Sequence, residues 1–288
     1  MTNREELRKG RETAVNAQTA QTAEAAQAVE AAQAVEAAQA AKTIQTALRE
    51  KAVAVTGLSK SYSGKKVIEN LNLTIRTGQI YGLLGANGAG KSTAVECILG
   101  TRRADSGEVR ILGLDPVTER RHLFEQVGVQ FQEASYPDRI KVRELCEETA
   151  CLYEKTADYR DLLRQFKLED KADSMLSQLS GGQKQRLFII LALIPGPRVV
   201  FLDELTTGLD TKSRREVWKC LLEMKDKGLS ICLVSHFMDE VEMLCDQIGI
   251  LRDGMFVFEG TVKEAVDNSP YSNLEDAYLW WTQEEENR

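Results

Sequence analysis

The chain is poor in the residues that build metal and disulfide sites. It contains only two histidines, His122 and His236, and its six cysteines are scattered without a C-x-x-C pair. A structural zinc site needs about four clustered Cys or His ligands, so the sequence argues against one. Most of the cysteines stand in apolar stretches, which favours small buried hydrophobic residues in a reducing compartment over disulfides.

The sequence also lacks the marks of a membrane-spanning or nucleic-acid-binding protein. A membrane helix needs about 20 apolar residues, whereas the longest apolar run, Leu187 to Ile194, ends at Pro195-Gly196-Pro197. The N-terminal segment is charged and has no apolar core, so we expect no signal peptide. No basic stripe appears and the net charge is −7, so we expect no nucleic-acid partner. If the protein works at a membrane, another subunit must supply the spanning part.

The composition changes near residue 50. The unit Glu-Ala-Ala-Gln-Ala-Val begins at Glu24 and at Glu30, and an imperfect copy follows from Glu36. At about 3.6 residues per helical turn, successive copies fall on different faces and form no continuous apolar stripe. We therefore predict that residues 1–50 are a flexible or partly helical tail, with a partner-binding helix as the alternative. Residues 51–288 have the ordinary composition of one globular domain.

Apolar patterns in this domain predict strands on both sides of a polar helical block. Two unbroken apolar runs, Val199 to Leu202 and Leu229 to Val234, are typical of central parallel strands that are buried on both faces. Residues from about 133 to 178 carry helical patterns, and we predict that they form an inserted helical subdomain. Further predicted elements are strands at Val53–Leu58, Leu71–Ile75 and Gln79–Leu84, a helix over Lys91–Leu99 ended by Gly100, helices within Val142–Leu152 and Tyr159–Phe166, and a late hairpin over Ile248–Phe258.

The segment Gly85 to Ser92 fits the pattern G-x-x-x-x-G-K-[ST], after a predicted strand and before a predicted helix. Glycines let backbone N–H groups close around phosphate oxygens, and the helix N-terminus adds a positive dipole. We expect Lys91 to reach the β- and γ-phosphates of ATP and the Ser92 hydroxyl to bind Mg²⁺. A glycine-rich turn without a ligand is the alternative. The predicted phosphate-loop residues are Gly85, Asn87, Gly88, Ala89, Gly90, Lys91, Ser92 and Thr93.

Two carboxylates, Asp203 and Glu204, follow the predicted strand Val199 to Leu202. Parallel α/β sheets bind ligands at the carboxyl ends of their strands, where this pair is expected to lie. We predict that Asp203 binds Mg²⁺, usually through water, and that Glu204 orients and deprotonates the attacking water. Many strands end in acidic loops, so the pair points to an ATPase only together with the phosphate loop.

A second string, Leu179 to Gln183, is also suited to phosphate. The Ser180 hydroxyl and the N–H groups of Gly181 and Gly182 stand at a predicted helix start, where they are good donors to an anion. One chain has no obvious need for two such motifs on one nucleotide. A nucleotide shared between two chains would use both, so we predict that the partner is a second copy of the same chain.

These motifs make the chain resemble the ATP-binding subunits of ABC transporters over about residues 51 to 282. Leu179 to Gln183 matches the signature of that family without change. Gln132 is similar to the Q-loop glutamine, Thr207 to Asp210 is similar to the D-loop, and His236 is similar to the switch histidine. The resemblance implies an α/β fold: a P-loop NTPase of the ABC type, with a mixed β core, an antiparallel β subdomain and an inserted α-helical subdomain.

The resemblance also implies a role for individual residues. Gln132 would contact Mg²⁺ and sense the helical subdomain, with Gln130 as the alternative register. His236 would hold the γ-phosphate and help Glu204 to position water. Tyr62 would stack on adenine, although plain packing also explains a tyrosine there. In a head-to-tail dimer, the signature of one chain would act on ATP held by the other, and the predicted site includes Ser180, Gly181, Gly182, Gln183 and Asp210.

The family usually has a proline after the glutamate, and this chain has Leu205 there. Proline restricts the residue before it, so we expect Leu205 to loosen the backbone of Glu204 without abolishing activity.

The segment Phe131 to Glu144 is similar to exporters of the ABC-2, multidrug or antibiotic-resistance type. The chain ends soon after Leu279, which leaves no room for the regulatory domain of many sugar and methionine importers. We therefore expect an ATPase subunit at the cytoplasmic face of the membrane that powers a separate permease, exporting drugs, antibiotics, lipids or similar molecules. The alternative is a soluble single-cassette ABC ATPase that serves an assembly process such as iron–sulfur cluster formation.

Overall fold

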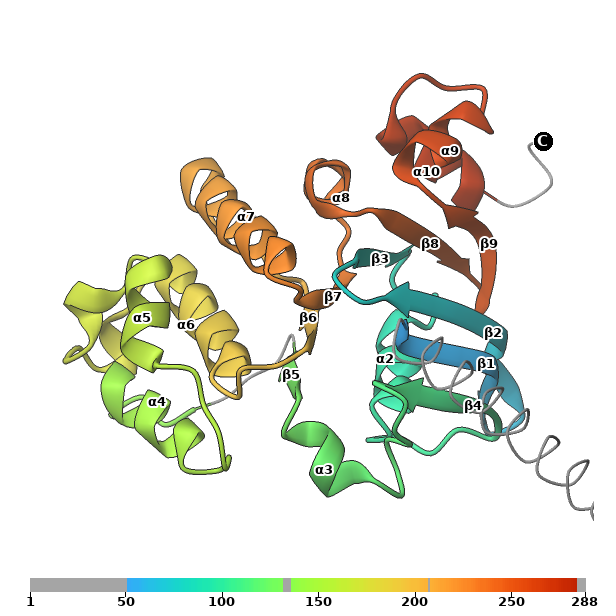
Figure 1. Ribbon diagram of the computed structural model, residues 1–288. Coiled ribbons are helices and arrows are strands. Elements are labelled where there is room, and N and C mark those ends of the chain that lie inside the picture. The colour runs from blue at the N-terminus through green and yellow to red at the C-terminus, as the bar shows by residue number, and fades with distance from the viewer. Residues whose placement is uncertain (1–50, 132–135, 207, 284–288) are drawn as a thin grey trace, which may run out of the picture. The chain divides into compact units, whose positions relative to one another are not determined.

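The computed structural model (Figure 1) describes residues 51–131, 136–206 and 208–283. The predicted tail, together with Gln132 and Thr207, lies outside the described residues. Within them, no helix is both long enough and apolar enough to span a bilayer.

A three-stranded antiparallel sheet forms the first layer, in the order β2-β1-β4. Strands β1 (Lys51–Tyr62) and β2 (Lys65–Arg76) are joined by a two-residue turn, Ser63-Gly64, whose φ angles of 49° and 82° are both positive. Such a turn matches the right-handed twist of a hairpin. Strand β4 (Ser106–Ile111) pairs with the other edge of β1. This sheet is the antiparallel β subdomain that the resemblance implied.

A six-stranded sheet of order β5-β6-β7-β3-β8-β9 forms the second layer. All neighbouring strands run parallel except β9, which pairs with β8 as the predicted hairpin. Every residue of β6 and β7 is buried, as their apolar runs predicted. The strands are β3 (Ile80–Gly85), β5 (Val127–Gln130), β6 (Val199–Asp203), β7 (Ser230–Val234), β8 (Gln247–Arg252) and β9 (Met255–Gly260).

Several helices flank the sheets. Helix α2 (Lys91–Ile98) follows β3, with Leu99 as its C-cap residue. Gly100 comes directly after the cap, where a helical stop was predicted, and its φ of 64° is the left-handed geometry that glycine tolerates. The C-terminal helices α9 (Val262–Asp267) and α10 (Leu274–Thr282) share an apolar cluster with β8. Three other helices outside the helical group described next are α3 (Arg120–Phe124), α7 (Thr211–Asp226) and α8 (Met238–Leu244).

A group of helices lies between β5 and β6 in the sequence and stands apart from the β1-β2-β4 sheet in Figure 1. Its members pack around one apolar cluster that includes Leu163, Phe166 and Leu187. Helix α6 belongs to this group and carries the chain back to the six-stranded sheet. The elements are α4 (Val142–Ala150), α5 (Tyr159–Gln165), the short 3₁₀ helices η1 (Glu169–Lys171) and η2 (Leu176–Gln178), and α6 (Gly181–Leu193).

Candidate functional site

The loop between β3 and α2 takes a shape that requires glycine. The φ angles are 83° at Gly88 and 107° at Gly90, a region in which other residues are strained. A Cβ on Gly90 would lie 2.7 Å from the carbonyl oxygen of Val67 and 2.7 Å from Cδ1 of Ile68. The loop therefore packs directly against β2, and a side chain at position 90 would force the loop and β2 apart.

Helix α2 begins at the end of this loop without a side-chain cap. Its N-cap residue is Gly90, and its first turn contains no acidic residue. The first N–H groups of a helix have no partner within the helix, and they carry the positive end of its dipole. A helix start of this kind is suited to bind a phosphate.

The Lys91 side chain folds back over the loop. Its Nζ donates hydrogen bonds to the carbonyl oxygens of Gly85, at 2.7 Å, and Ala86, at 3.1 Å. Burial lowers the pKa of Lys91, and the charges of Asp203 and Glu204 oppose that shift. When Lys91 binds a phosphate, the phosphate oxygens would replace these loop carbonyl oxygens as the acceptors of its hydrogen bonds.

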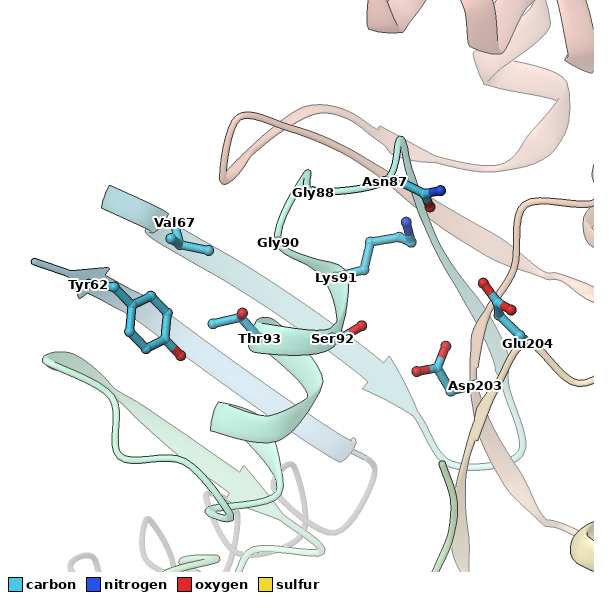
Figure 2. Close-up of a pocket in the computed structure, with 10 residues that line it drawn as sticks. All are labelled: Tyr62, Val67, Asn87, Gly88, Gly90, Lys91, Ser92, Thr93, Asp203 and Glu204. Carbon is cyan, nitrogen blue, oxygen red and sulfur yellow. The ribbon is translucent and has the colours of Figure 1, made fainter. Parts of the chain in front are cut away.

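A cavity of about 540 Å³ opens beside the loop. This volume is within the usual range of small-molecule sites. Figure 2 shows the carboxylates of Asp203 and Glu204 on the side of Lys91 and the Tyr62 ring at the opposite end. Val67 also lines the cavity, and no pattern in the sequence selects this aliphatic residue. The full lining is Tyr62, Val67, Asn87, Gly88, Gly90, Lys91, Ser92, Thr93, Asp203 and Glu204.

Tyr62 lies at the rim of the cavity, with 37% of its surface exposed. Lys60 Nζ and Arg102 Cζ each lie 5.4 Å from the centroid of its ring. The ring is therefore available beside the cavity, as stacking on a base requires, and it is already flanked by two cations. The adenine role of Tyr62 stays a prediction.

Asp203 ends the buried strand β6, and its side chain points into the cavity (Figure 2). Burial and, secondly, the neighbouring charge of Glu204 raise the pKa of Asp203 to about 6, against the opposing attraction of Lys91. A carboxylate pair held in a partly dry site gains from any cation that joins it. The site therefore favours a bound cation next to Asp203.

Glu204 has a left-handed backbone, with φ of 51°. Its N–H donates to the carbonyl oxygen of Val234 at 2.9 Å, and its own carbonyl accepts from Gln185 Nε2 at 3.4 Å. Strained backbone of this kind often occurs at functional sites. Leu205, which stands in place of the usual proline, is fully buried in the core.

His236 follows β7, the strand next to β6. Its Nδ1 lies 3.6 Å from Glu204 Oε1, and its ring stays half-exposed. The two residues that the sequence assigned to hydrolysis therefore meet at the carboxyl ends of two paired strands.

The signature segment does not line this cavity. Ser180 is the N-cap of α6, and it forms a reciprocal capping box with Gln183. Ser180 Oγ accepts from the Gln183 N–H at 3.2 Å, and Gln183 Oε1 accepts from the Ser180 N–H at 2.9 Å. The Gln183 side chain thus serves the helix cap, while the Ser180 hydroxyl keeps its proton to donate. The structure does not bring Ser180, Gly181, Gly182 or Gln183 to the cavity of the same chain.

Comparison with known proteins agrees with this architecture. Residues 68–207 match the family model described as ABC transporter. The Nod factor export ATP-binding protein I of Burkholderia lata is 36% identical over 217 residues, which are 73% of this chain and 71% of that protein. The chain belongs to the ABC transporter family. It is an ABC ATPase, the ATP-binding and ATP-hydrolysing subunit of a transporter.

Solved structures share the fold of this ABC ATPase. The structure of an ATP-binding subunit of an ABC transporter superposes with a TM-score of 0.74 at 26% identity, over 80% of this chain and 99% of the other. A structure described as a dimeric bacterial ABC transporter cassette gives a TM-score of 0.65 at 24% identity, over 73% of this chain and 98% of the other. The α/β fold of ABC type that the sequence predicted is confirmed.

Three further predicted site residues have local structural roles in the ABC ATPase. Asp210 caps α7: its Oδ1 accepts from the Ser213 N–H at 2.9 Å, and its Oδ2 accepts from Ser213 Oγ at 2.7 Å. Gly85 ends β3 and Ala89 is a buried residue of the loop; a Cβ on Gly85 would lie 2.5 Å from the Leu251 carbonyl oxygen and 3.1 Å from the Ala89 Cβ. None of the three lines the cavity. Their part in nucleotide binding stays a prediction.

The residues at the site fit Mg²⁺ and a triphosphate. Mg²⁺ takes oxygen ligands, keeps several waters and binds through one or two carboxylates together with substrate phosphates. Ser92 and Asp203 supply a hydroxyl and a carboxylate at one wall of the cavity, and the buried Asp203 lies beside the like charge of Glu204. The uncapped start of α2 and Lys91 supply the positive wall for phosphates.

Proposed function

We propose that this ABC ATPase holds MgATP in the cavity beside its own phosphate loop and hydrolyses it only when a second copy closes over the nucleotide. The observation that carries the proposal is the separation of the two phosphate motifs. Lys91, Ser92 and Asp203 line the cavity, whereas Ser180 caps a helix outside it. A second copy in head-to-tail arrangement would bring its own Ser180, Gly181 and Gly182 to the γ-phosphate, where their donors are useful.

In this proposal, Glu204 accepts a proton from the attacking water and His236 holds the γ-phosphate. The two side chains lie 3.6 Å apart, so one water and one phosphate oxygen can meet both. Mg²⁺ would neutralise charge on the phosphates, with Ser92, Asp203 and Gln132 as its protein ligands. Lys91 would leave the loop carbonyls and donate to the β- and γ-phosphates.

The transported molecule is handled by another subunit in this proposal. The ATPase would bind a separate permease at the cytoplasmic face of the membrane and power export of drugs, antibiotics, lipids or similar molecules. The Burkholderia lata relative is named as an export protein, which supports this direction. The export direction also agrees with the likeness of the segment from Phe131 to Glu144 to multidrug and antibiotic exporters.

The variant Glu204→Gln tests the hydrolytic part. It should bind ATP as well as the wild type and lose nearly all turnover, because the amide cannot accept the proton from water. A dimer should accumulate with ATP and be visible by size-exclusion chromatography. Glu242→Gln, an exposed carboxylate on α8, is the control and should keep full turnover. Unchanged turnover in Glu204→Gln would remove Glu204 as the base, and a monomer that turns over ATP would remove the shared site.

The transport part has a separate test. Affinity purification of the tagged chain from membranes in mild detergent should recover a polytopic membrane protein, and coexpression of that protein should place the chain in the membrane fraction. Recovery of soluble partners alone would favour the assembly-type ATPase and reject the exporter.

A further inference from the structure

Glu240 is a fully buried carboxyl in the helix that follows His236. It lies on α8, four residues after His236, and none of its surface is exposed. Its Oε1 accepts a hydrogen bond from the indole Nε1 of Trp218, on α7, at 3.1 Å. Burying a carboxyl costs free energy unless several partners stabilise it. The burial of Glu240 therefore needs an explanation.

Two hydroxyls and a guanidinium complete those surroundings. The Ser235 and Thr206 side chains face the carboxyl of Glu240, and the charge of Arg214 lies near it. Among the residues that the structure describes, Glu240 Oε2 and Thr206 Oγ1 are both buried without a hydrogen bond of good geometry. Burial raises the pKa of Glu240, and its neighbours oppose that shift. The cluster is polar, closed to solvent and not fully satisfied, so a small displacement changes its hydrogen bonds.

Two neighbours of Glu240, Ser235 and Thr206, belong to segments that carry a predicted site residue. Ser235 Oγ accepts from the Phe237 N–H at 3.1 Å, so this hydrogen bond joins the residues immediately before and after His236. The Thr206 carbonyl oxygen accepts from the Leu209 N–H at 3.1 Å, in the loop that begins two residues after Glu204. The carboxyl therefore stands where the turn of His236 meets the loop that follows Glu204.

A second set of contacts continues from this cluster to the imidazole. The rings of His236 and Phe237 have centroids 4.1 Å apart, and Arg214 lies 4.8 Å over the Phe237 ring. Arg214 Nη1 also pairs with Asp239 Oδ2 at 2.8 Å. The position of the His236 ring thus depends on packing that is anchored on α7 and α8.

We propose that Glu240 is a positioning residue for hydrolysis, which fixes the turn of His236 against the loop after Glu204. This inference rests on the proposed roles of Glu204 and His236. Glu240 contacts neither nucleotide nor water in this role. It acts by holding Ser235 and Thr206 at a fixed separation, with Trp218 as the anchor in α7.

Two substitutions separate hydrogen bonding from charge. Glu240→Gln can still accept from Trp218, and its amide group can donate to the Ser235 and Thr206 hydroxyls, so turnover should stay near that of the wild type. Glu240→Ala removes the acceptor of the Trp218 indole and the carboxyl that Ser235 and Thr206 face, and it should lower kcat by about 10- to 100-fold, the size expected for a displacement of about 1 Å. The KM for ATP should change little, since the phosphate loop is not involved. Glu259→Ala, which removes another carboxyl with an aromatic donor, Tyr81 Oη at 3.1 Å, is the matched control and should keep kcat.

A double-mutant cycle with His236 tells positioning from general destabilisation. If Glu240 acts through His236, Glu240→Ala should lower turnover much less in a His236→Ala background than in the wild type, because the group it positions is gone. Equal fold losses in both backgrounds, or wild-type kcat in folded Glu240→Ala, would overturn the inference.

Folding is checked separately by nucleotide binding and thermal unfolding. If Glu240→Ala does not fold, Glu240→Gln and Trp218→Phe carry the test: Trp218→Phe should lower kcat with unchanged KM, and full kcat in this variant would overturn the inference. A His236→Ala variant with wild-type turnover would instead refute the proposed function, whatever Glu240 does.

Discussion

Neutralising Asp203 should stabilise the nucleotide-free protein while removing its turnover of MgATP. Burial and the charge of Glu204 raise the pKa of Asp203 from 3.8 to about 6, and this value already includes the attraction of Lys91. A shift of about two units corresponds to at most about 3 kcal/mol. Water in the open cavity screens part of it. We therefore expect Asp203→Asn to raise the free energy of unfolding by about 1–2 kcal/mol at neutral pH.

The pH dependence of this gain has a definite sign. Because the folded-state pKa of Asp203 is raised, the folded protein binds this proton more tightly than the unfolded chain does. The wild type therefore loses stability as pH rises through the window from about 4 to about 6. Below that window the carboxyl is neutral in both states, so the advantage of Asp203→Asn should vanish there and reach its full size above it.

Urea unfolding without nucleotide, followed by tryptophan fluorescence, measures this difference at about pH 4.5, 5.5, 6.5 and 7.5. Asp210→Ala gives a control of opposite sign, because hydrogen bonds from Ser213 lower the pKa of Asp210. Its removal should destabilise the protein at neutral pH, and less so as pH falls. The reasoning is refuted if Asp203→Asn is no more stable than the wild type at neutral pH, or if its advantage does not change with pH.

Two further pairs of substitutions test the loop and the shared site. Gly90→Ala places a Cβ 2.7 Å from the Val67 carbonyl oxygen, so this variant should unfold at lower urea and lose ATP binding. In Gly88→Ala the Cβ meets nothing within 4 Å. The free energy of unfolding of this control should therefore fall only by the cost of backbone strain, about 1 kcal/mol. Equal urea midpoints would contradict the clash. Ser180→Arg should bind ATP normally and lack turnover, and mixing it with Lys91→Ala should restore measurable turnover, because the mixed dimer holds one intact composite site. No recovery in mixed dimers would contradict the shared site.

The sequence predicted the elements whose patterns are local. The apolar runs of β6 and β7 identify strands buried on both faces, and the glycines around Lys91 identify the loop before α2. Strand β4 could not be found in this way: of Ser106–Ile111, only Ile111 is fully buried, and the strand exists through its pairing with β1. The position of Val67 in the cavity wall could not be predicted either, since an aliphatic side chain in a sequence does not indicate a binding or catalytic role.

Glu240 shows the limit of sequence reasoning most clearly. In the sequence it stands within Met238-Asp239-Glu240-Val241-Glu242, where a charged residue usually marks the solvated face of a helix. Its burial depends on Trp218, 22 residues earlier, and on the loop at Thr206. Only the packing of α8 against α7 creates that environment. A residue of this kind cannot be selected by composition or spacing.

The parallel sheet explains why Glu204 and His236 can meet within one chain even if, as proposed, the ATP site needs a second copy. Asp203 pairs with Val234 in the ladder between β6 and β7, and the Glu204 N–H donates to Val234 at 2.9 Å. Glu204 and His236 therefore follow the ends of neighbouring strands at the same edge of the sheet. Backbone hydrogen bonds hold these two strand ends next to each other. Ser180 caps α6 and does not line the cavity, although Gln185 of the same helix donates to the Glu204 carbonyl oxygen at 3.4 Å. We therefore expect regulation to act on the approach of the second copy, and not on the assembly of Glu204 with His236.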